Sequence, residues 1–327
     1  MRSLVLFDGL GARNESLIPA LRQARRHSGN AAFFHSVHRA LDEMVDYLGP
    51  VVLPDGLPLE KWLGGVEPRA LDSTATGVLV HVHQLVRLQP GTPPGDVVGA
   101  LGHSIGLQAA VVAGVRSRRL DDFFALATGS VKLVLAGLVR AQQLAPDTGA
   151  PMCAVTGPTT ADLRAVLTDH PTVSIGLINT PTAHVLTGPP ADLRALRGTA
   201  PFTRQDTTWT DLPTTIPFHS PLLAGLPARV RADLPAIGPL PGPGDLALPV
   251  YAADGGRDLR GADDLVTEYL DQVFARPNDW ASAVTRAVAD ASADRVLDAG
   301  PGPGARRFTR ECLRGTTVRV EPLRPAG

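Results

Sequence analysis

The segment Gly102-His103-Ser104-Ile105-Gly106 places a serine between two glycines. It follows the apolar run 97–101 and precedes an Ala/Val-rich stretch with helical character. A serine at such a strand-to-helix turn is presented above the end of a sheet, and small flanking residues tolerate the strained backbone. The start of the helix also offers free N–H groups and a positive dipole end to a developing oxyanion. The pattern therefore predicts that Ser104 is a nucleophile.

A nucleophilic serine needs a base, and the chain has nine histidines. His219 lies in Ile216-Pro217-Phe218-His219-Ser220-Pro221, where prolines hold a loop after an element boundary. A loop histidine taken alone is more often simply exposed. His81 and His83 are two residues apart in a helical segment and point in different directions, so they make a poor metal pair. We expect His219 to be the base and expect no metal site.

The composition limits the class of protein. The chain has 327 residues, of which 44% are hydrophobic and 19% charged, as in folded soluble proteins. A net charge of -1 provides no basic field for nucleic acid or an anionic membrane. Two cysteines, Cys153 and Cys312, indicate a reducing compartment. No segment reaches about 18 consecutive apolar residues, so we expect a cytoplasmic protein without a membrane span.

The order of predicted elements indicates an α/β fold in two parts. The apolar runs 4–7 and 97–101 read as strands buried on both faces, and helical patterns cover 15–26, 31–47, 74–88 and 120–144. Segment 151–211 differs, because strands at 152–156, 173–178, 184–186 and 202–207 alternate with helices at 160–168 and 190–196. That βαββαβ order is ferredoxin-like. We expect a large α/β-hydrolase-like part with a parallel sheet (1–150 and 212–327) and a small inserted ferredoxin-like part (151–211).

Several short segments together resemble the malonyl-CoA:acyl-carrier-protein transacylase family. The resemblance is closest to the acyltransferase domains of fungal-type fatty acid synthases and to starter-unit acyltransferase domains of polyketide synthases. Each segment is weak alone, but their shared order spans nearly the whole chain. They are LFDGLG (6–11), GHSIGL (102–107), INTP (178–181), VLTGPP (185–190), PFHS (217–220), PVY (249–251), RPNDW (276–280) and LDAGPG (297–302).

The resemblance implies transfer of an acyl group from a coenzyme A thioester to an acyl carrier protein, without a bound cofactor. His219 would take the proton of Ser104, and the resulting acyl-serine would be attacked by the carrier's phosphopantetheine thiol. The backbone N–H groups of Leu10 and Ile105 would form the oxyanion hole. The backbone carbonyl of Arg276 would orient the histidine. The family likeness also favours a monomer.

Substrate-binding residues are likewise implied by the resemblance. Malonyl-selective members carry an arginine that binds the free carboxylate, and the best match is Arg140; the alternative is a surface arginine near a helix end. Phe218 resembles the malonyl-type pattern. Asn179 matches an asparagine close to the site, or is a turn residue before Thr180-Pro181. His103, beside the nucleophile, completes the predicted substrate-binding set.

The chain departs from the family pattern at two positions, and other functions stay open. The family usually has Gly-Gln-Gly where this chain has Leu10 between glycines, which would change side-chain contacts to the substrate. Starter-unit members often have a cysteine where this chain has Ser104, so this serine favours the fatty-acid-synthase type. The alternatives are a loader of a monocarboxylic starter unit, a serine thioesterase or editing hydrolase, and a non-enzymatic carrier-binding scaffold. A hydrolase would be indicated by a carboxylate partner for the histidine, for which Asp206 and Asp211 are candidates.

Overall fold

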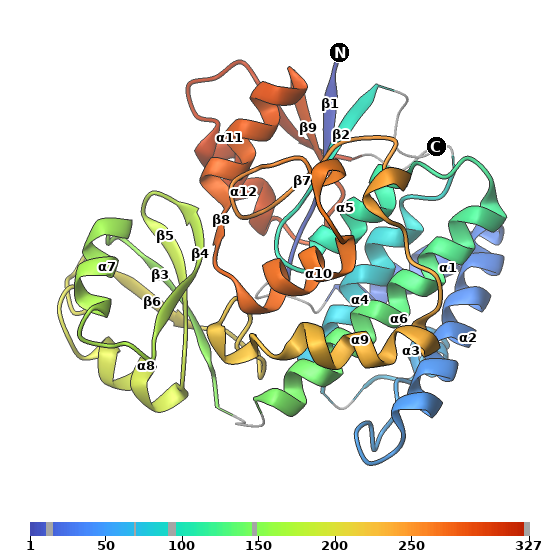
Figure 1. Cartoon of the computed structure of the whole chain (residues 1–327), viewed down its shortest axis with the longest axis horizontal. Coiled ribbons are helices and arrows are strands. Elements are labelled where there is room, and N and C mark those ends of the chain that lie inside the picture. Colours follow the sequence, from blue (N-terminus) through green and yellow to red (C-terminus); the bar gives the residue numbers. More distant parts are fainter. Residues whose placement is uncertain (11–15, 69, 91–95, 146–148, 324–327) are drawn as a thin grey trace.

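The computed structural model describes residues 1–10, 16–68, 70–90, 96–145 and 149–323 (Figure 1). The strands are β1 Ser3–Phe7, β2 Val97–Gly102, β3 Met152–Thr156, β4 Ser174–Thr180, β5 Ala183–Thr187, β6 Thr208–Asp211, β7 Val250–Tyr251, β8 Asn278–Asp279, β9 Arg295–Asp298 and β10 Arg319–Pro322. The helices are α1 Leu17–Arg25, α2 Ala31–Leu48, α3 Leu59–Leu63, α4 Ser73–Val86, α5 Gly106–Val115, α6 Leu120–Leu144, α7 Thr160–Leu167, α8 Pro190–Arg197, α9 Leu226–Ile237, α10 Leu265–Leu270, α11 Trp280–Ala291 and α12 Gly304–Cys312.

The larger sheet has the order β10-β9-β1-β2-β7, and its strands pair in parallel. All five residues of β1 are buried, as expected for a central strand with helices on both faces. Val5 and Phe7 pack into a core with α2, α4, α5 and α6. Leu4 and Leu6 pack on the opposite face, against α11 and α12. The predicted α/β class with a parallel sheet is confirmed.

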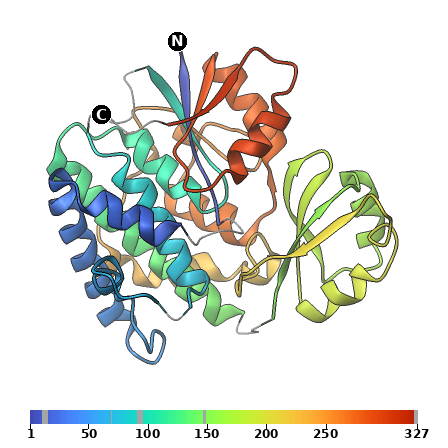
Figure 2. The same ribbon diagram turned by 180° about the vertical axis from the view of Figure 1, so that it is seen from behind.

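Helix α6 extends through the helical side of the large part. Its composition and length of 25 residues would suffice to cross a membrane, but 67% of its most apolar window is buried inside the molecule. It packs against α2, α4 and α9, which Figures 1 and 2 show around it. These contacts account for its apolar sequence as that of a core helix.

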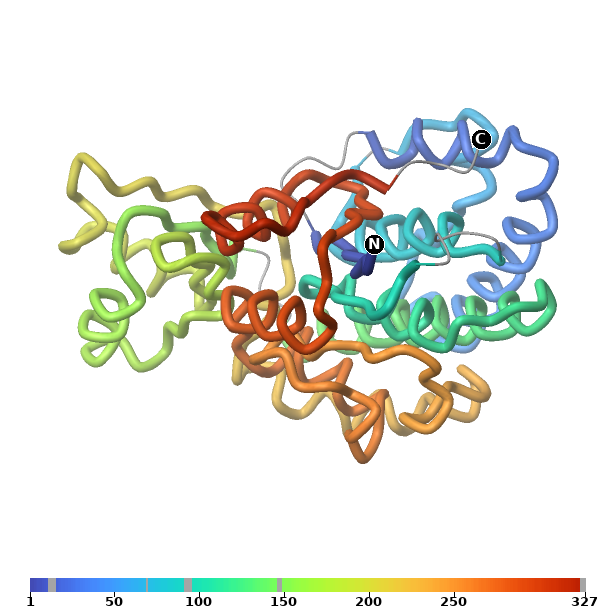
Figure 3. Tube along the Cα trace, turned by 90° about the horizontal axis from the view of Figure 1, so that it is seen from above, coloured from blue at the N-terminus to red at the C-terminus, as the bar shows by residue number. Residues whose placement is uncertain are grey.

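The smaller sheet has the order β6-β3-β5-β4-β8. Its first four strands come from 152–211 and alternate with α7 and α8 in the expected βαββαβ order. The fifth strand, β8, comes from the C-terminal part of the chain and pairs in parallel with β4, so both parts of the chain build this sheet. Figures 1 and 3 show the small part standing beside the large one.

The last strand of the small part is not where the sequence pattern predicted it. Residues 202–207 form turns, held by bonds such as Arg204 N–H to the Pro201 carbonyl and Thr207 N–H to the Arg204 carbonyl. The strand is β6, which begins at Thr208 and pairs with β3. Phe202 lies in the small core, its ring 5.1 Å from that of Trp209. Burial of Phe202 therefore explains the apolar signal without a strand.

Candidate active site

Ser104 occupies the sharp turn between β2 and α5. Its φ of 52° lies in the left-handed region that non-glycine residues rarely adopt and that is concentrated at functional sites. The flanking glycines are required by close packing. A Cβ on Gly106 would lie 2.5 Å from the Phe7 carbonyl oxygen, and one on Gly102 would lie 2.2 Å from the Leu107 nitrogen. The small residues therefore let α5 start directly against β1 and hold the serine at the end of the sheet.

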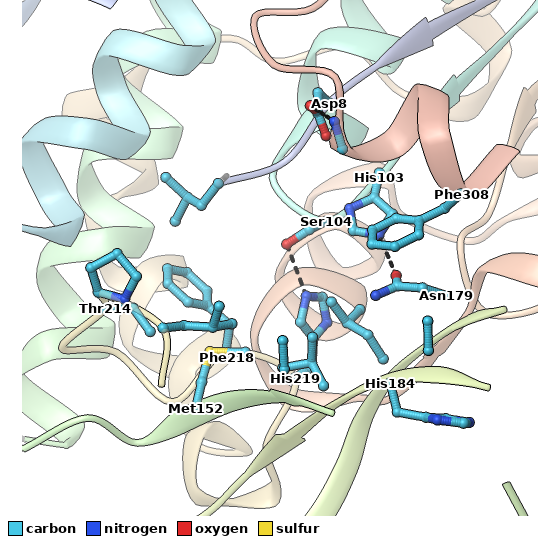
Figure 4. A pocket seen from close by; sticks show the side chains of 18 of the residues that line it. Asp8, His103, Ser104, Met152, Asn179, His184, Thr214, Phe218, His219 and Phe308 are labelled. Carbon is cyan, nitrogen blue, oxygen red and sulfur yellow. Dashed lines mark hydrogen bonds between the residues drawn. The ribbon is translucent and has the colours of Figure 1, made fainter. Parts of the chain in front are cut away.

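The structure brings Ser104 and His219 together. The hydroxyl oxygen lies 2.8 Å from His219 Nε2, as Figure 4 shows. His219 Nδ1 lies 2.8 Å from the Gln272 carbonyl oxygen and 3.3 Å from that of Arg276. Because carbonyl oxygens only accept hydrogen bonds, Nδ1 carries the proton in the neutral ring. Nε2 then has a free lone pair, and the serine hydroxyl donates to it.

The loop of His219 is fixed by the π-helical turn Asp271–Ala275. The His219 and Ser220 amides donate to carbonyls of this turn, at 3.3 and 2.9 Å, and His219 itself has a φ of 57°. The expected contact of the Arg276 carbonyl with Nδ1 is present at 3.3 Å, and the Gln272 carbonyl, which the sequence did not single out, lies half an ångström nearer. The π-helical turn brings this carbonyl to the ring, and no side-chain pattern in the sequence signals such a contact.

Burial dominates the electrostatics of the two site histidines. It lowers the pKa of His219 to about 3; the charge of a protonated His103 would lower this pKa further, and the two carbonyl bonds oppose the fall. Burial also lowers the pKa of His103, against the opposing charge of Asp8. His103 Nε2–H donates to Asn179 Oδ1 at 2.8 Å, and its ring packs edge-on against Trp280. Both histidines are therefore neutral at pH 7.

Of the two predicted oxyanion donors, Ile105 follows the serine directly in the chain and Leu10 lines the same cavity as the serine. Gly9 approaches the elbow so closely that a Cβ there would lie 3.0 Å from the Ser104 Cβ. Among the described residues, the amides of Leu10 and Ile105 donate to no acceptor of the fold, and Leu10 lines the cavity at Ser104. Gly11 lies outside the described residues. Two free N–H groups beside a nucleophile are what a developing oxyanion requires.

Sequence reasoning missed Asp8, which fixes the loop before Leu10. Its carboxylate accepts hydrogen bonds from the amides of Gly9, Gly304 and Ala305, at 2.9, 3.1 and 3.0 Å. It therefore joins the end of β1 to the first turn of α12. The position of an aspartate directly after a buried strand was the available signal, but two of its three partners lie almost 300 residues away in the sequence.

Ser104 and His219 open into a cavity of about 310 Å³ between the two parts of the molecule. Figure 4 shows Phe218, Met152 and Thr214 on one side of the pair, and Asn179 and Phe308 on the other. The wall is mostly apolar; its apolar members are Leu10, Met152, Ala154, Leu177, Ala183, Val185, Leu212, Pro213, Phe218, Pro303 and Phe308. Met152, Phe308 and Arg307 were not singled out from the sequence.

The interpretation of Arg140 as a carboxylate-binding residue is wrong. Its guanidinium makes a two-bond pair with the Asp233 carboxylate, at 2.9 and 2.8 Å, and it does not line the cavity. Asp233 is almost fully buried and also accepts from the Tyr47 hydroxyl at 3.2 Å. Arg140 thus joins α6 to α9. The partner lies 93 residues away, which the sequence pattern of α6 alone did not reveal.

Among the residues that the structure describes, no carboxylate accepts a hydrogen bond from His219, as a hydrolase triad would require. Asp211 accepts a hydrogen bond from Trp209 Nε1 at 2.9 Å and lies 3.8 Å from Arg197. Both Nδ1 contacts of His219 are to backbone carbonyls.

Comparison with known proteins gives a consistent picture. Residues 5–219, more than half of the chain, match the sequence profile of a family described as starter unit:ACP transacylase in aflatoxin biosynthesis. The chain is also similar to the fatty acid synthase beta subunit aflB of Emericella nidulans, with 29% identity over 320 residues. That alignment covers 82% of this chain but only 15% of the relative.

Two solved structures have the same fold. One is the acyltransferase domain from the second module of the salinomycin polyketide synthase, with a TM-score of 0.72 and 22% identity over 99% of this chain and 70% of that one. The other is the malonyl-transacylase in the PlMCAT:AntF complex with a type II polyketide synthase acyl-carrier protein, with a TM-score of 0.74 and 16% identity over 100% and 97%.

Proposed function

Because the chain belongs to the starter unit:ACP transacylase family, we propose that it moves an acyl group from a coenzyme A thioester to an acyl carrier protein. The observation that carries the proposal is the 2.8 Å hydrogen bond from the Ser104 hydroxyl to a neutral His219, which backbone carbonyls orient at the wall of the cavity. This arrangement suits a serine nucleophile with a histidine base, which is the chemistry of acyl transfer through an acyl-enzyme.

The proposed reaction proceeds in two half-reactions, in which Ser104 is first acylated and then deacylated. His219 Nε2 takes the hydroxyl proton as Ser104 Oγ bonds to the thioester carbon, and the amides of Leu10 and Ile105 hold the oxyanion. The carbon–sulfur bond breaks, and the leaving coenzyme A sulfur takes the proton from His219. In the second half, the carrier's thiol gives its proton to His219 and attacks the acyl-serine. Ser104 Oγ leaves and recovers the proton.

The acyl group is proposed to be uncharged, as expected of a monocarboxylic starter unit. A buried carboxylate without a cation costs several kcal/mol. The side of the cavity that holds Phe218, Met152 and Thr214 offers apolar carbon and hydroxyl groups, and Arg140 is committed to Asp233. Among the described residues of the cavity wall the one arginine is Arg307, whose guanidinium lies 5.3 Å from the centre of the Phe308 ring. Phe308 itself lies on the opposite side of Ser104 from Phe218. These features favour a monocarboxylic group over malonyl.

The test is intact mass spectrometry after brief incubation with acetyl-, butyryl-, octanoyl- and malonyl-coenzyme A. We expect an adduct of one acyl group with the monocarboxylic donors, no adduct on Ser104→Ala, and a kcat/KM for malonyl lower by about tenfold or more, since 1.4 kcal/mol corresponds to tenfold. Near-normal acylation of Ser104→Ala would contradict the mechanism. A preference for malonyl-coenzyme A would contradict only the proposal that the acyl group is uncharged, and the serine mechanism would stand.

A further inference from the structure

Arg307 stands apart from the other charged groups of the cavity wall. It lies on α12, exposed to solvent, with its guanidinium 5.3 Å from the centre of the Phe308 ring. The Phe308 ring lies 6.1 Å from that of His103, the neighbour of the nucleophile. Arg307 therefore contacts Phe308, and Phe308 contacts the residue before the nucleophile. Phe308 lies on the side of Ser104 opposite Phe218 (Figure 4).

The neighbouring arginines of α12 are engaged, whereas Arg307 is not. Arg306 lies 3.4 Å from the Asp298 carboxylate, and Arg310 donates to the Val320 carbonyl at 2.9 Å. Within the described ranges, Arg307 makes neither an ion pair nor a side-chain hydrogen bond. Of the described residues on the same cavity wall, Asp8 is the one carboxylate, and it already accepts from three amides. Arg307 therefore keeps its donors free for a ligand anion.

We infer that Arg307 binds the phosphate at the far end of the pantetheine arm of the acyl donor and acceptor. This inference rests on the proposed function, which brings a pantetheine thioester to Ser104. If the acyl group occupies the Phe218 side of the cavity, the pantetheine arm occupies the Phe308 side. The phosphate is then at the end of the arm that reaches the protein surface. A guanidinium fork matches phosphate oxygens with two parallel hydrogen bonds. Stacking on Phe308 pre-orients the fork.

The same phosphate chemistry has two sources. Coenzyme A brings a diphosphate in the first half-reaction, and the carrier protein brings the phosphodiester of its prosthetic group in the second. Because an acyl-enzyme separates the two halves, each source can be measured alone. Single-turnover acylation reports the first, and discharge of purified acyl-enzyme reports the second.

The experiment compares Arg307→Ala with wild type, using butyryl-coenzyme A and butyryl-pantetheine, which lacks the phosphate. Discharge is measured with the holo-carrier and with free pantetheine. We expect Arg307→Ala to lower kcat/KM about tenfold for the phosphate-bearing partner, and to leave the pantetheine reactions unchanged. Arg307→Lys should recover part of the loss, and salt should shrink the difference from wild type. Arg314→Ala, an exposed arginine just after the same helix, is the matched control and should behave as wild type.

A loss of kcat/KM that is confined to the phosphate-bearing partner, in one half-reaction or in both, supports the phosphate site. The half-reaction that is affected identifies whether coenzyme A, the carrier protein or both supply the phosphate. Equal losses with and without the phosphate would overturn the inference, because Arg307 would then act on the chemistry or on the fold. An unchanged rate in every arm would overturn it as well. Failure of the proposed function itself is distinguishable, because the wild-type protein would then form no butyryl adduct with either donor.

Discussion

His219 is held by backbone carbonyls, and this determines how it responds to pH. Neutral carbonyls orient the ring without a compensating negative charge, so burial lowers its pKa to about 3. A base with a lowered pKa stays neutral, and able to accept the serine proton, at pH values where an exposed histidine is protonated. The base is correspondingly weak, so the oxyanion donors must stabilise the charge pair that forms.

This leads to a prediction for the pH profile of acylation. The single-turnover rate with butyryl-coenzyme A should fall on the acid side with an apparent pKa below 6.5, the value of an unperturbed histidine. The measurement is quenched-flow mass spectrometry after a brief jump from pH 7 to each lower pH, which keeps the protein folded during one turnover. An acid limb centred at or above 6.5 would contradict the burial argument.

Arg140 supports a second prediction, on stability instead of specificity. Asp233 is almost fully buried, and removing its partner leaves an uncompensated charge. We expect Arg140→Ala to lower the free energy of unfolding by about 2–4 kcal/mol, measured by urea denaturation. This is below the roughly 3–5 kcal/mol of a fully buried pair, because the Arg140 side chain is 23% exposed. The ratio of butyryl to malonyl transfer should not change. A selective loss of malonyl transfer would restore Arg140 to the acyl site.

Between elements, Asp8 joins β1 to α12 and so couples the Leu10 loop to the helix that carries Arg307 and Phe308. Removing its carboxylate leaves three amides without their acceptor. We expect Asp8→Ala to lower the free energy of unfolding by about 1–3 kcal/mol and to slow single-turnover acylation at saturating donor. Asp8→Asn retains one oxygen and should recover part of both.

The matched control for Asp8 is Asp279→Ala, at the residue that directly precedes the neighbouring helix α11. Asp279 caps that helix by accepting from the Ser282 amide at 3.0 Å, and it does not line the cavity. We expect Asp279→Ala to lower the free energy of unfolding about as much as Asp8→Ala does, without slowing acylation. If both variants slow acylation in proportion to their loss of stability, Asp8 has no positioning role beyond holding the fold.

Elements with a strong local pattern were predictable from the sequence. Helix 120–144 was predicted with the bounds it has, because its apolar period, not its partners, defines it. The elbow at Ser104 was equally local, since a glycine, a serine and a second glycine must follow a buried strand. The predicted order of elements in 151–211 rested on the same kind of short-range signal, and only its last strand was misplaced.

Features that depend on distant partners were not predictable. The strand β8 has two residues and exists only because β4 lies beside it. The Gln272 carbonyl reaches His219 through a π-helical turn, and a backbone group leaves no trace in residue type. Arg140 matched the position of the family's arginine when residues were counted along the helix, but its guanidinium binds Asp233 on another helix. In each case tertiary contact outweighed local pattern.

On the scale of the whole molecule, several histidines are buried, and no carboxylate of the described residues stabilises their protonated form. Burial lowers the pKa of His81 and His219 to about 3 and that of His83 and His184 to about 4. Each stays neutral in the folded state and takes up a proton near pH 6.5 when unfolded. Burial raises the pKa of Asp298 to about 6, which has the opposite effect, because the folded state then binds that proton first.

The sign of the pH dependence follows from these shifts. A lowered histidine pKa contributes stability that is fully present above pH 6.5, the pKa in the unfolded state, and that is lost as the pH falls toward the pKa in the folded state. Asp298 has the opposite effect: it adds stability as the pH falls from about 6, its pKa in the folded state, to its lower pKa in the unfolded state. Counting only the two fully buried histidines, His81 and His219, against Asp298, we expect the free energy of unfolding to fall by about 2–3 kcal/mol between pH 7 and pH 5. Urea denaturation at pH 7, 6 and 5 measures this. The free energy of unfolding of His81→Gln should depend less steeply on pH than that of wild type, whatever its absolute value.

A free energy of unfolding that stays level or rises toward pH 5 would mean that these rings gain protons in the folded protein. The neutral His219 from which acyl transfer was derived would then be wrong as well.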